Sequence, residues 1–164
     1  MKICVISDLH IDSNRWDWHL LDPVKEADVL VVAGDISNDI WVNCNWLKNA
    51  RSMFNQVIYV AGNHEHYHGD FKFTLSGLKN KLGRLKNLHI LDKEVFKYRS
   101  MADQTEYTFV GSTLWTDMNK EDPLTLHAMS SMMNDFRIIN NSNRMVSRTV
   151  PVYEYDSDGR VAYN

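Results

Sequence analysis

The segment DVLVVAG, residues 28–34, is a short, unbroken run of apolar and mostly β-branched residues. Such a run is typical of a strand that is buried on both faces of a sheet. Similar runs, KICVIS (2–7) and QVIYVAG (56–62), lie on either side of it, and segments of helical length, residues 16–26 and 40–54, separate the three. This order predicts parallel strands with right-handed crossovers, and therefore an α/β fold with a mostly parallel first sheet and helices outside it.

The second half of the chain is richer in expected strands. After a polar loop, residues 71–85 carry apolar side chains at helical spacing. Three runs then follow closely, at residues 88–91, 94–99 and 106–115. Their short separations favour neighbouring, partly antiparallel strands.

Two local signals mark the last part of the chain. Asp122 followed by Pro123 predicts the capped start of a helix over residues 122–133, whose methionines fall at helical spacing and are expected in the core. Asp158 and Gly159 predict a hairpin turn between alternating apolar and polar residues. The sequence ends in the return strand of that hairpin, which indicates a sheet that is incomplete at the C-terminus.

Length and composition fit one soluble domain. The chain has 164 residues, of which 44% are apolar and 24% charged, and its formal net charge is -3. A negative net charge does not favour binding to nucleic acid that is driven mainly by electrostatic attraction, although nucleic acid remains a possible substrate. Two cysteines make no disulfide framework, and no apolar run reaches the about 20 residues of a membrane span. We therefore expect a cytoplasmic protein.

Polar clusters follow each of the first three predicted strands. The clusters contain Asp8 and His10, then Gly34 and Asp35, then Gly62, Asn63, His64 and Glu65. Because the carboxyl ends of parallel strands share one edge of a sheet, we expect the clusters to converge there. Asp8 and His10 are two residues apart, so both side chains would point the same way in an extended segment.

Carboxylate, imidazole and amide ligands suit divalent ions such as Mn²⁺, Fe, Zn²⁺ or Ni²⁺. Two carboxylates against two dications would leave a positive site that attracts phosphate and lowers the pKa of bound water. Any one of these residues alone would more often cap a helix or stabilise a turn. Their combination favours metal binding. The ligand types leave all four of these ions open, and among them we favour Mn²⁺ as the working expectation.

The three motifs, in this order and each after a strand, resemble those of the calcineurin-like metallophosphoesterase superfamily. GSTLWTD (111–117) and MNDFRII (133–139) further resemble a bacterial and phage branch of it. The resemblance implies part of an α/β/β/α sandwich, formed by residues 1–164 as a single metallophosphoesterase domain that is incomplete at the C-terminus.

The resemblance also implies roles for particular residues. Asp8 and His10 would bind a first metal, Asp35 would bridge two metals, and Asn63 would bind the second. His64 would face the phosphate as the catalytic residue, stabilising the transition state or protonating the leaving oxygen.

Other residues of these motifs have lesser expected roles. Glu65 would support its loop, and Arg137 is a candidate for contact with the substrate phosphate beside its default role in surface ion pairing. In AGNHEHYHGD (61–70), three alternate histidines suggest a local metal cluster. The resemblance to the family argues against such a cluster. It implies that only His64 belongs to the site, and that His66 and His68 line or flank the loop.

Two hypotheses about function follow. The first is a metal-dependent phosphoesterase that hydrolyses a phosphomono- or phosphodiester through a hydroxide activated by two metal ions, with His64 assisting the leaving group. The second is a truncated, catalytically inert fragment or scaffold with a partial metal site, since the family's later histidine motifs are absent: only His89 and His127 follow His68. Missing strands would expose apolar sheet surface and favour self-association.

Overall fold

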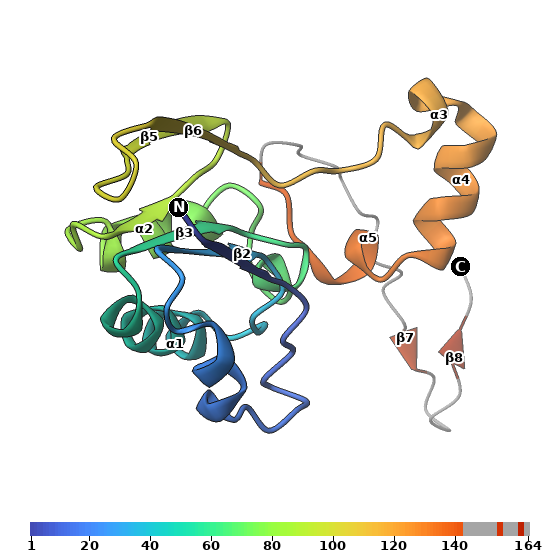
Figure 1. Cartoon of the computed structure of the whole chain (residues 1–164). Coiled ribbons are helices and arrows are strands. Elements are labelled where there is room, and N and C mark those ends of the chain that lie inside the picture. The colour runs from blue at the N-terminus through green and yellow to red at the C-terminus, as the bar shows by residue number, and fades with distance from the viewer. Residues whose placement is uncertain (143–153, 156–160, 163–164) are drawn as a thin grey trace.

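A computed structural model of the chain describes residues 1–142, 154–155 and 161–162. Its centre is a parallel sheet with the strand order β1-β2-β3-β4 (Figure 1). The strands are β1 (Ile3–Ile6), β2 (Val29–Ala33), β3 (Gln56–Val60) and β4 (Leu88–Ile90). The predicted parallel sheet is confirmed, and β4 extends it because it pairs parallel with β3.

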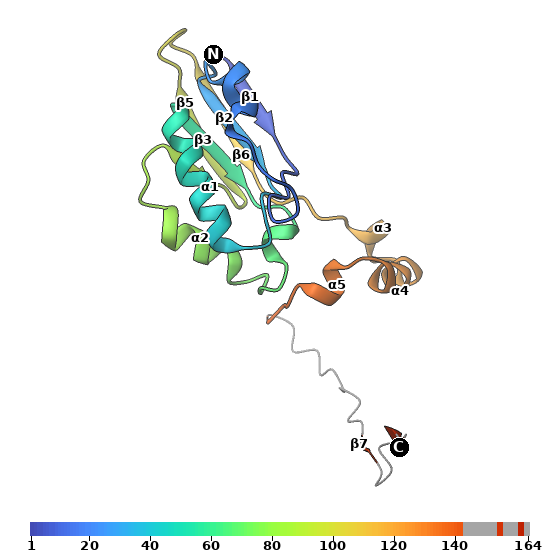
Figure 2. The same cartoon turned by 90° about the horizontal axis from the view of Figure 1, so that it is seen from below.

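Helices cover one face of this sheet (Figure 2). They are the 3₁₀ helix η1 (Trp18–Val24), α1 (Ile40–Met53) and α2 (Thr74–Leu82). Helix α1 begins where the Asp39 carboxylate accepts hydrogen bonds from the Trp41 and Val42 amides. The core between helices and sheet contains fully buried side chains from β2, β3, α1 and α2, among them Leu30, Val32, Leu47, Ala50, Val57, Tyr59, Leu78 and Leu82.

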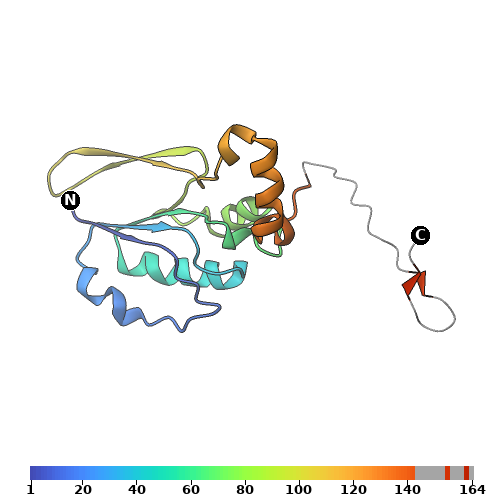
Figure 3. The same cartoon turned by 90° about the vertical axis from the view of Figure 1, so that its right-hand side faces the viewer.

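A second sheet packs on the opposite face, so the molecule is layered as helices, sheet and sheet (Figure 3). It is the antiparallel hairpin β5 (Glu94–Arg99) and β6 (Glu106–Gly111). Its Phe96 stacks on His89 of β4 at 3.5 Å between ring centroids. On the outer face, the cross-strand pair Val95 and Val110 is 59% and 78% exposed. Among residues 1–142, no helix buries this pair, which matches the expectation of a partial sandwich.

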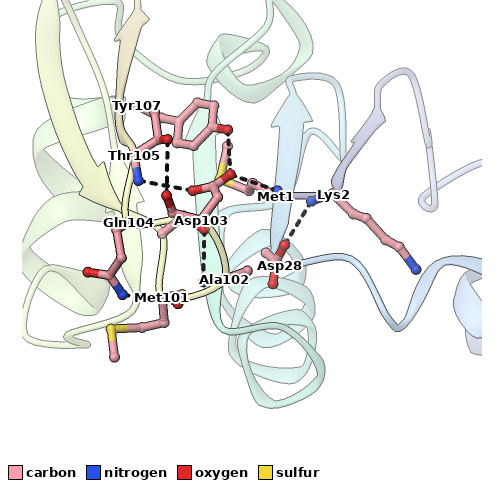
Figure 4. A network of polar contacts seen from close by, with 10 residues as sticks. Met1, Lys2, Asp28, Met101, Ala102, Asp103, Gln104, Thr105 and Tyr107 are labelled. Atoms are coloured by element: carbon pink, nitrogen blue, oxygen red, sulfur yellow. Dashed lines mark hydrogen bonds and ion pairs between the residues drawn. The ribbon is translucent and has the colours of Figure 1, made fainter.

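Polar contacts hold the hairpin turn of the second sheet beside the N-terminus (Figure 4). The Asp103 carboxylate accepts hydrogen bonds from the Thr105 amide at 3.0 Å and the Tyr107 hydroxyl at 2.8 Å, and it pairs with the Met1 amino group at 3.2 Å. These contacts, the Thr105 amide first, hold the pKa of Asp103 well below its usual range. The start of β1 and the turn between β5 and β6 are therefore linked.

The last described elements lie beyond the carboxyl edge of the first sheet (Figure 1). They are α3 (Met118–Glu121), α4 (Pro123–Met132), α5 (Asp135–Ile138), β7 (Glu154–Tyr155) and β8 (Val161–Ala162). Asp122 caps α4 as predicted. The expectation that the methionines of this segment are in the core is wrong, because α4 buries no residue and Met132 is 74% exposed. Strands β7 and β8 pair antiparallel, but the predicted turn at Asp158 and Gly159 lies outside the described residues.

No helix within the described part of the chain combines the length and the apolar character needed to cross a membrane.

Candidate metal centre

The loops that follow the first three strands meet at the carboxyl edge of the sheet, as predicted. The loop after β1 continues to pair beyond the strand, because the Asp8 amide donates to the Gly34 carbonyl at 3.2 Å and the His10 amide donates to the Asp35 carbonyl at 3.0 Å. The loop after β3 joins them through the His64 amide, which donates to Asp35 Oδ1 at 3.0 Å. Asp35 is therefore central to all three loops.

The backbone at this edge is not extended. Asp8, His10 and Asp35 have φ angles of 56°, 44° and 56°, all in the left-handed region. The expectation of an extended segment from Asp8 to His10 is therefore wrong, although Asp8 Oδ1 still lies 3.9 Å from His10 Nε2. Non-glycine residues with positive φ cost conformational energy and persist where neighbouring structure holds them, often at functional sites. Here the hydrogen bonds between the loops hold them.

Two glycines allow the loops to approach each other. Gly34 has a φ of 84°, and a Cβ atom at this position would overlap the backbone of Gly62. A Cβ atom at Gly62 would in turn overlap the carboxylate of Asp35. Larger residues at either position would separate the loops that carry the candidate ligands.

Glu65 links the loop after β2 to the loop after β3. Its side chain is 4% exposed, and its carboxylate accepts hydrogen bonds from the Asp35, Ile36 and Gly62 amides at 3.0, 2.7 and 2.7 Å. Burial raises the pKa of Glu65, while the three amides act in the opposite direction. The interpretation that Glu65 supports its loop is confirmed.

Three of the predicted site residues form a compact donor set. Ligand atoms of His10, Asp35 and His64 all lie within 4.8 Å of one another, and the three side chains are half-buried. The imidazole rings of His10 and His64 meet edge to face, with centroids 4.3 Å apart. Two imidazole nitrogens and a carboxylate oxygen suit a borderline divalent ion, so the residues present fit such an ion.

Asp8 lies beside this donor set rather than within it. Its side chain is 68% exposed, and its Oδ1 lies 3.9 Å from His10 Nε2. It is not one of the three residues whose ligand atoms all lie within 4.8 Å of one another. A carboxylate with this exposure is accessible to solvent and to an incoming ion. Its assignment as a metal ligand stays a prediction.

Asn63 is oriented by a chain of hydrogen bonds. Its Nδ2 donates to the Tyr67 hydroxyl at 3.1 Å, and that hydroxyl donates to Asp135 Oδ2 at 3.5 Å. Because an ionised carboxylate only accepts, the single hydroxyl proton is directed to Asp135 and the Tyr67 oxygen accepts from Asn63. The amide oxygen of Asn63 is then the atom that could bind an ion.

Sequence reasoning missed the roles of Tyr67 and Asp135. The Tyr67 ring also stacks on His64, with centroids 4.3 Å apart. Burial, and then the charge of Asp135, raises the pKa of Tyr67 and keeps its hydroxyl protonated. The position of Tyr67, four residues after Asn63, was the available signal, whereas Asp135 lies 72 residues after Asn63 and offered none.

The local cluster of three histidines is not formed. The buried ring of His66 stacks on Phe71, with centroids 5.1 Å apart, and burial lowers its pKa, which favours the neutral form. His68 has a φ of 59°, and its amide donates to the Ile138 carbonyl. Only His64 belongs to the donor set. His66 and His68 lie outside the donor set, as expected, but His66 is buried in the protein rather than lining the site.

Arg137 lies exposed on α5. Its Nη2 donates to Asn134 Oδ1 at 2.7 Å, within the same short segment. Contact between Arg137 and a substrate phosphate stays a prediction.

Together, the layered α/β fold and the O/N donor set at the strand ends define a candidate site for a divalent metal ion. The family model described as calcineurin-like phosphoesterase (Metallophos) matches residues 1–157. The chain therefore belongs to the calcineurin-like phosphoesterase family, whose members depend on divalent metals.

A solved structure supports the fold independently. The chain is similar to the phosphopantetheinyl hydrolase of Mycobacterium tuberculosis, with a TM-score of 0.59 and 18% sequence identity. The likeness covers 85% of this chain and 55% of that one, so the chain spans about half the length of this neighbour. No curated protein sequence matches the chain.

Proposed function

We propose that the protein hydrolyses a phosphomonoester or phosphodiester with two divalent metal ions, preferably Mn²⁺. Asp8, His10, Asp35 and Asn63 would hold the ions, and His64 would be the catalytic residue. The observation that carries this proposal is the convergence of three loops that brings ligand atoms of His10, Asp35 and His64 within 4.8 Å of one another. Membership of the family supports it.

The chemistry divides between the ions and the side chains. The bound ions would supply positive charge for the phosphate and a nucleophile near neutral pH. His64 would hold a proton for the departing oxygen. Its ring is confined between His10 and Tyr67, which limits its orientations, and its backbone amide is held by Asp35.

His64→Ala tests the catalytic role. We expect kcat for bis(p-nitrophenyl) phosphate to fall about 10²- to 10⁴-fold, the usual contribution of general acid catalysis, while bound manganese stays near the wild-type level. Kinetic assays and metal analysis of the dialysed protein measure the two effects. His127→Ala, on the exposed helix α4, is the matched control. Loss of manganese from His64→Ala would instead make His64 a ligand together with His10 and Asp35.

Tyr67→Phe tests the orientation of Asn63. The substitution keeps the ring that stacks on His64 and removes the hydroxyl that accepts from Asn63. We expect manganese affinity to fall about 10- to 100-fold, as is usual when a residue that orients a ligand is removed. Calorimetric titration measures it, with Tyr107→Phe, whose hydroxyl binds Asp103, as control. An unchanged Kd would show that Asn63 does not need this chain of hydrogen bonds.

A second candidate is a fragment or scaffold that binds metal without turnover. It is favoured by the exposed position of Asp8 outside the donor set, and among the described residues no histidine after His64 joins that set. Hydrolysis of bis(p-nitrophenyl) phosphate by the purified chain with Mn²⁺ would exclude it. The exposed Val95 and Val110 fit the predicted self-association. Self-association, a nucleic-acid substrate and a cytoplasmic location stay predictions.

A further inference from the structure

A large cavity adjoins the candidate metal centre. Its volume is about 1100 Å³, and its wall includes Gly62 and Asn63, the residues directly before His64. From there it extends to the loop after β6 and to α5 and the residues that follow it. His10, Asp35 and His64 do not line the cavity, so a phosphate at the metal centre would lie beside it, at the side where Asn63 contributes to the wall. The cavity volume would then be free for the organic part of a phosphoester.

The wall of the cavity is mainly apolar and aromatic. Large side chains from three separate segments contribute to it, namely Phe71, Trp115, Met118, Met133, Phe136 and Ile139. Phe71, Trp115 and Phe136 are each partly exposed, although aromatic rings are normally buried in the core. Partly exposed aromatic side chains around one concave surface are typical of a ligand site.

The charged residues of the wall are all acidic. Asp70 and Asp135 line the cavity, and none of its lining residues within the described part of the chain is a lysine, arginine or histidine. A second phosphate placed in this cavity would meet carboxylates and find no cation. The cavity therefore disfavours a nucleic-acid strand or a polyphosphate, whose binding depends on lysine and arginine.

The lysines of this region belong to a different depression. A smaller pocket of about 290 Å³ is lined by Lys72, Lys79 and Lys93, and it shares Phe71 and Trp115 with the larger cavity. Lys79 is already paired with Glu94 at 2.8 Å. The smaller pocket does not include Gly62 or Asn63, so its lysines do not supply the charge that the larger cavity lacks.

We propose that the large cavity receives an uncharged, largely apolar organic group of the substrate, so that the protein acts on phosphoesters of apolar or aromatic alcohols rather than on nucleic acid. This inference rests on the proposed function, because it takes the metal centre as the place where the phosphate binds. Trp115 and Phe136 would be the residues that determine specificity.

Binding of two unreactive probes tests the proposal without turnover. Phenylphosphonate and methylphosphonate carry the same charged group and differ in apolar size. We expect calorimetry on the manganese-loaded protein to give at least about tenfold tighter binding of phenylphosphonate. Its ring would enter the cavity, and the apolar surface of the ring would be removed from water. Trp115→Ala and Phe136→Ala should each bring the ratio of affinities close to one.

Trp41→Ala is the matched control, since Trp41 is an exposed aromatic residue on α1 that does not line the cavity. It should keep the wild-type ratio, and thermal unfolding checks that all three variants are folded. Equal affinity of the wild type for both probes would overturn the inference. A wild-type ratio that persists in both Trp115→Ala and Phe136→Ala would overturn it too.

Hydrolysis separates this inference from the proposed function. Phenyl and methyl p-nitrophenyl phosphate share a leaving group, and we expect the phenyl ester to have the higher kcat/KM and a single-stranded oligonucleotide to remain intact. If neither ester is cleaved but phenylphosphonate still binds tighter, the proposed function fails and the cavity assignment stands. If both esters are cleaved equally, or the oligonucleotide is cleaved faster, the cavity assignment is wrong.

Discussion

Asp35→Asn is expected to abolish both manganese binding and hydrolysis of bis(p-nitrophenyl) phosphate. Asp35 is the one carboxylate of the compact donor set. In the proposed function it would bridge the two ions, as the resemblance to the family implies. An amide in its place removes the negative charge from the centre of the site. We expect kcat/KM to fall at least about 10³-fold, because the bound metal would supply both the nucleophile and the charge that stabilises the transition state.

The substitution is also structurally mild. Oδ1 of Asp35 accepts a hydrogen bond from the His64 amide, and the side-chain oxygen of asparagine can accept the same bond. The loops should therefore remain together while metal binding is lost. Circular dichroism and metal analysis of the same sample distinguish these two effects.

Asp12→Asn is the control for Asp35→Asn. Asp12 lies in the loop after β1, close to His10 in sequence, but it does not belong to the donor set. It should retain manganese and activity. A fully active, manganese-loaded Asp35→Asn protein would refute the proposed function, since no other carboxylate among the described residues shares this donor set.

Glu65→Ala is expected to lower the free energy of unfolding by at least about 3 kcal/mol, because three backbone amides at a largely buried position lose their acceptor and each unsatisfied amide costs about 1 to 3 kcal/mol. The amides belong to Asp35, Ile36 and Gly62, so the loss also separates the second loop from the third. Urea denaturation measures the change, and Glu26→Ala, at an exposed position, should have little effect.

Glu65→Gln refines this prediction. Glu65 Oε2 accepts from two amides, those of Asp35 and Gly62, whereas Oε1 accepts only from Ile36. A glutamine oxygen can replace Oε2, but its NH₂ group then faces the Ile36 amide without accepting from it. We expect a loss of stability smaller than that of Glu65→Ala. A change below about 0.5 kcal/mol in both variants, which is typical of surface positions, would show that the two loops do not depend on Glu65.

Several features of the fold were predictable from local sequence. Continuous β-branched runs at 2–7, 28–34 and 56–62 identified the first three strands. The expected burial on both faces holds for β2 and β3 but is wrong for β1, whose Ile3 and Val5 are 45% and 65% exposed. Strand and helix alternation then predicted parallel pairing, and parallel pairing placed Asp8, Asp35 and His64 at one edge. Asp122 with Pro123 predicted the start of α4 from capping chemistry alone.

Other features were decided by contacts between distant parts of the chain. The methionines near residue 133 have helical spacing, but spacing does not say whether another element covers the helix, and here none of α4 is buried. The left-handed φ angles of Asp8, His10 and Asp35 depend on hydrogen bonds between two loops. Neither feature leaves a signal in the local sequence.

The sequence by itself determined which residues gather at the edge of the sheet, because strand order and residue type are local properties that parallel pairing converts into proximity. Only the tertiary structure decided how these side chains are held: that Glu65 binds three backbone amides, that Tyr67 joins Asn63 to Asp135, and that His66 turns into the core. The physical reason is that hydrogen-bond partners and burial are set by packing between segments far apart in the chain. The spacing of residues in the sequence therefore does not predict them.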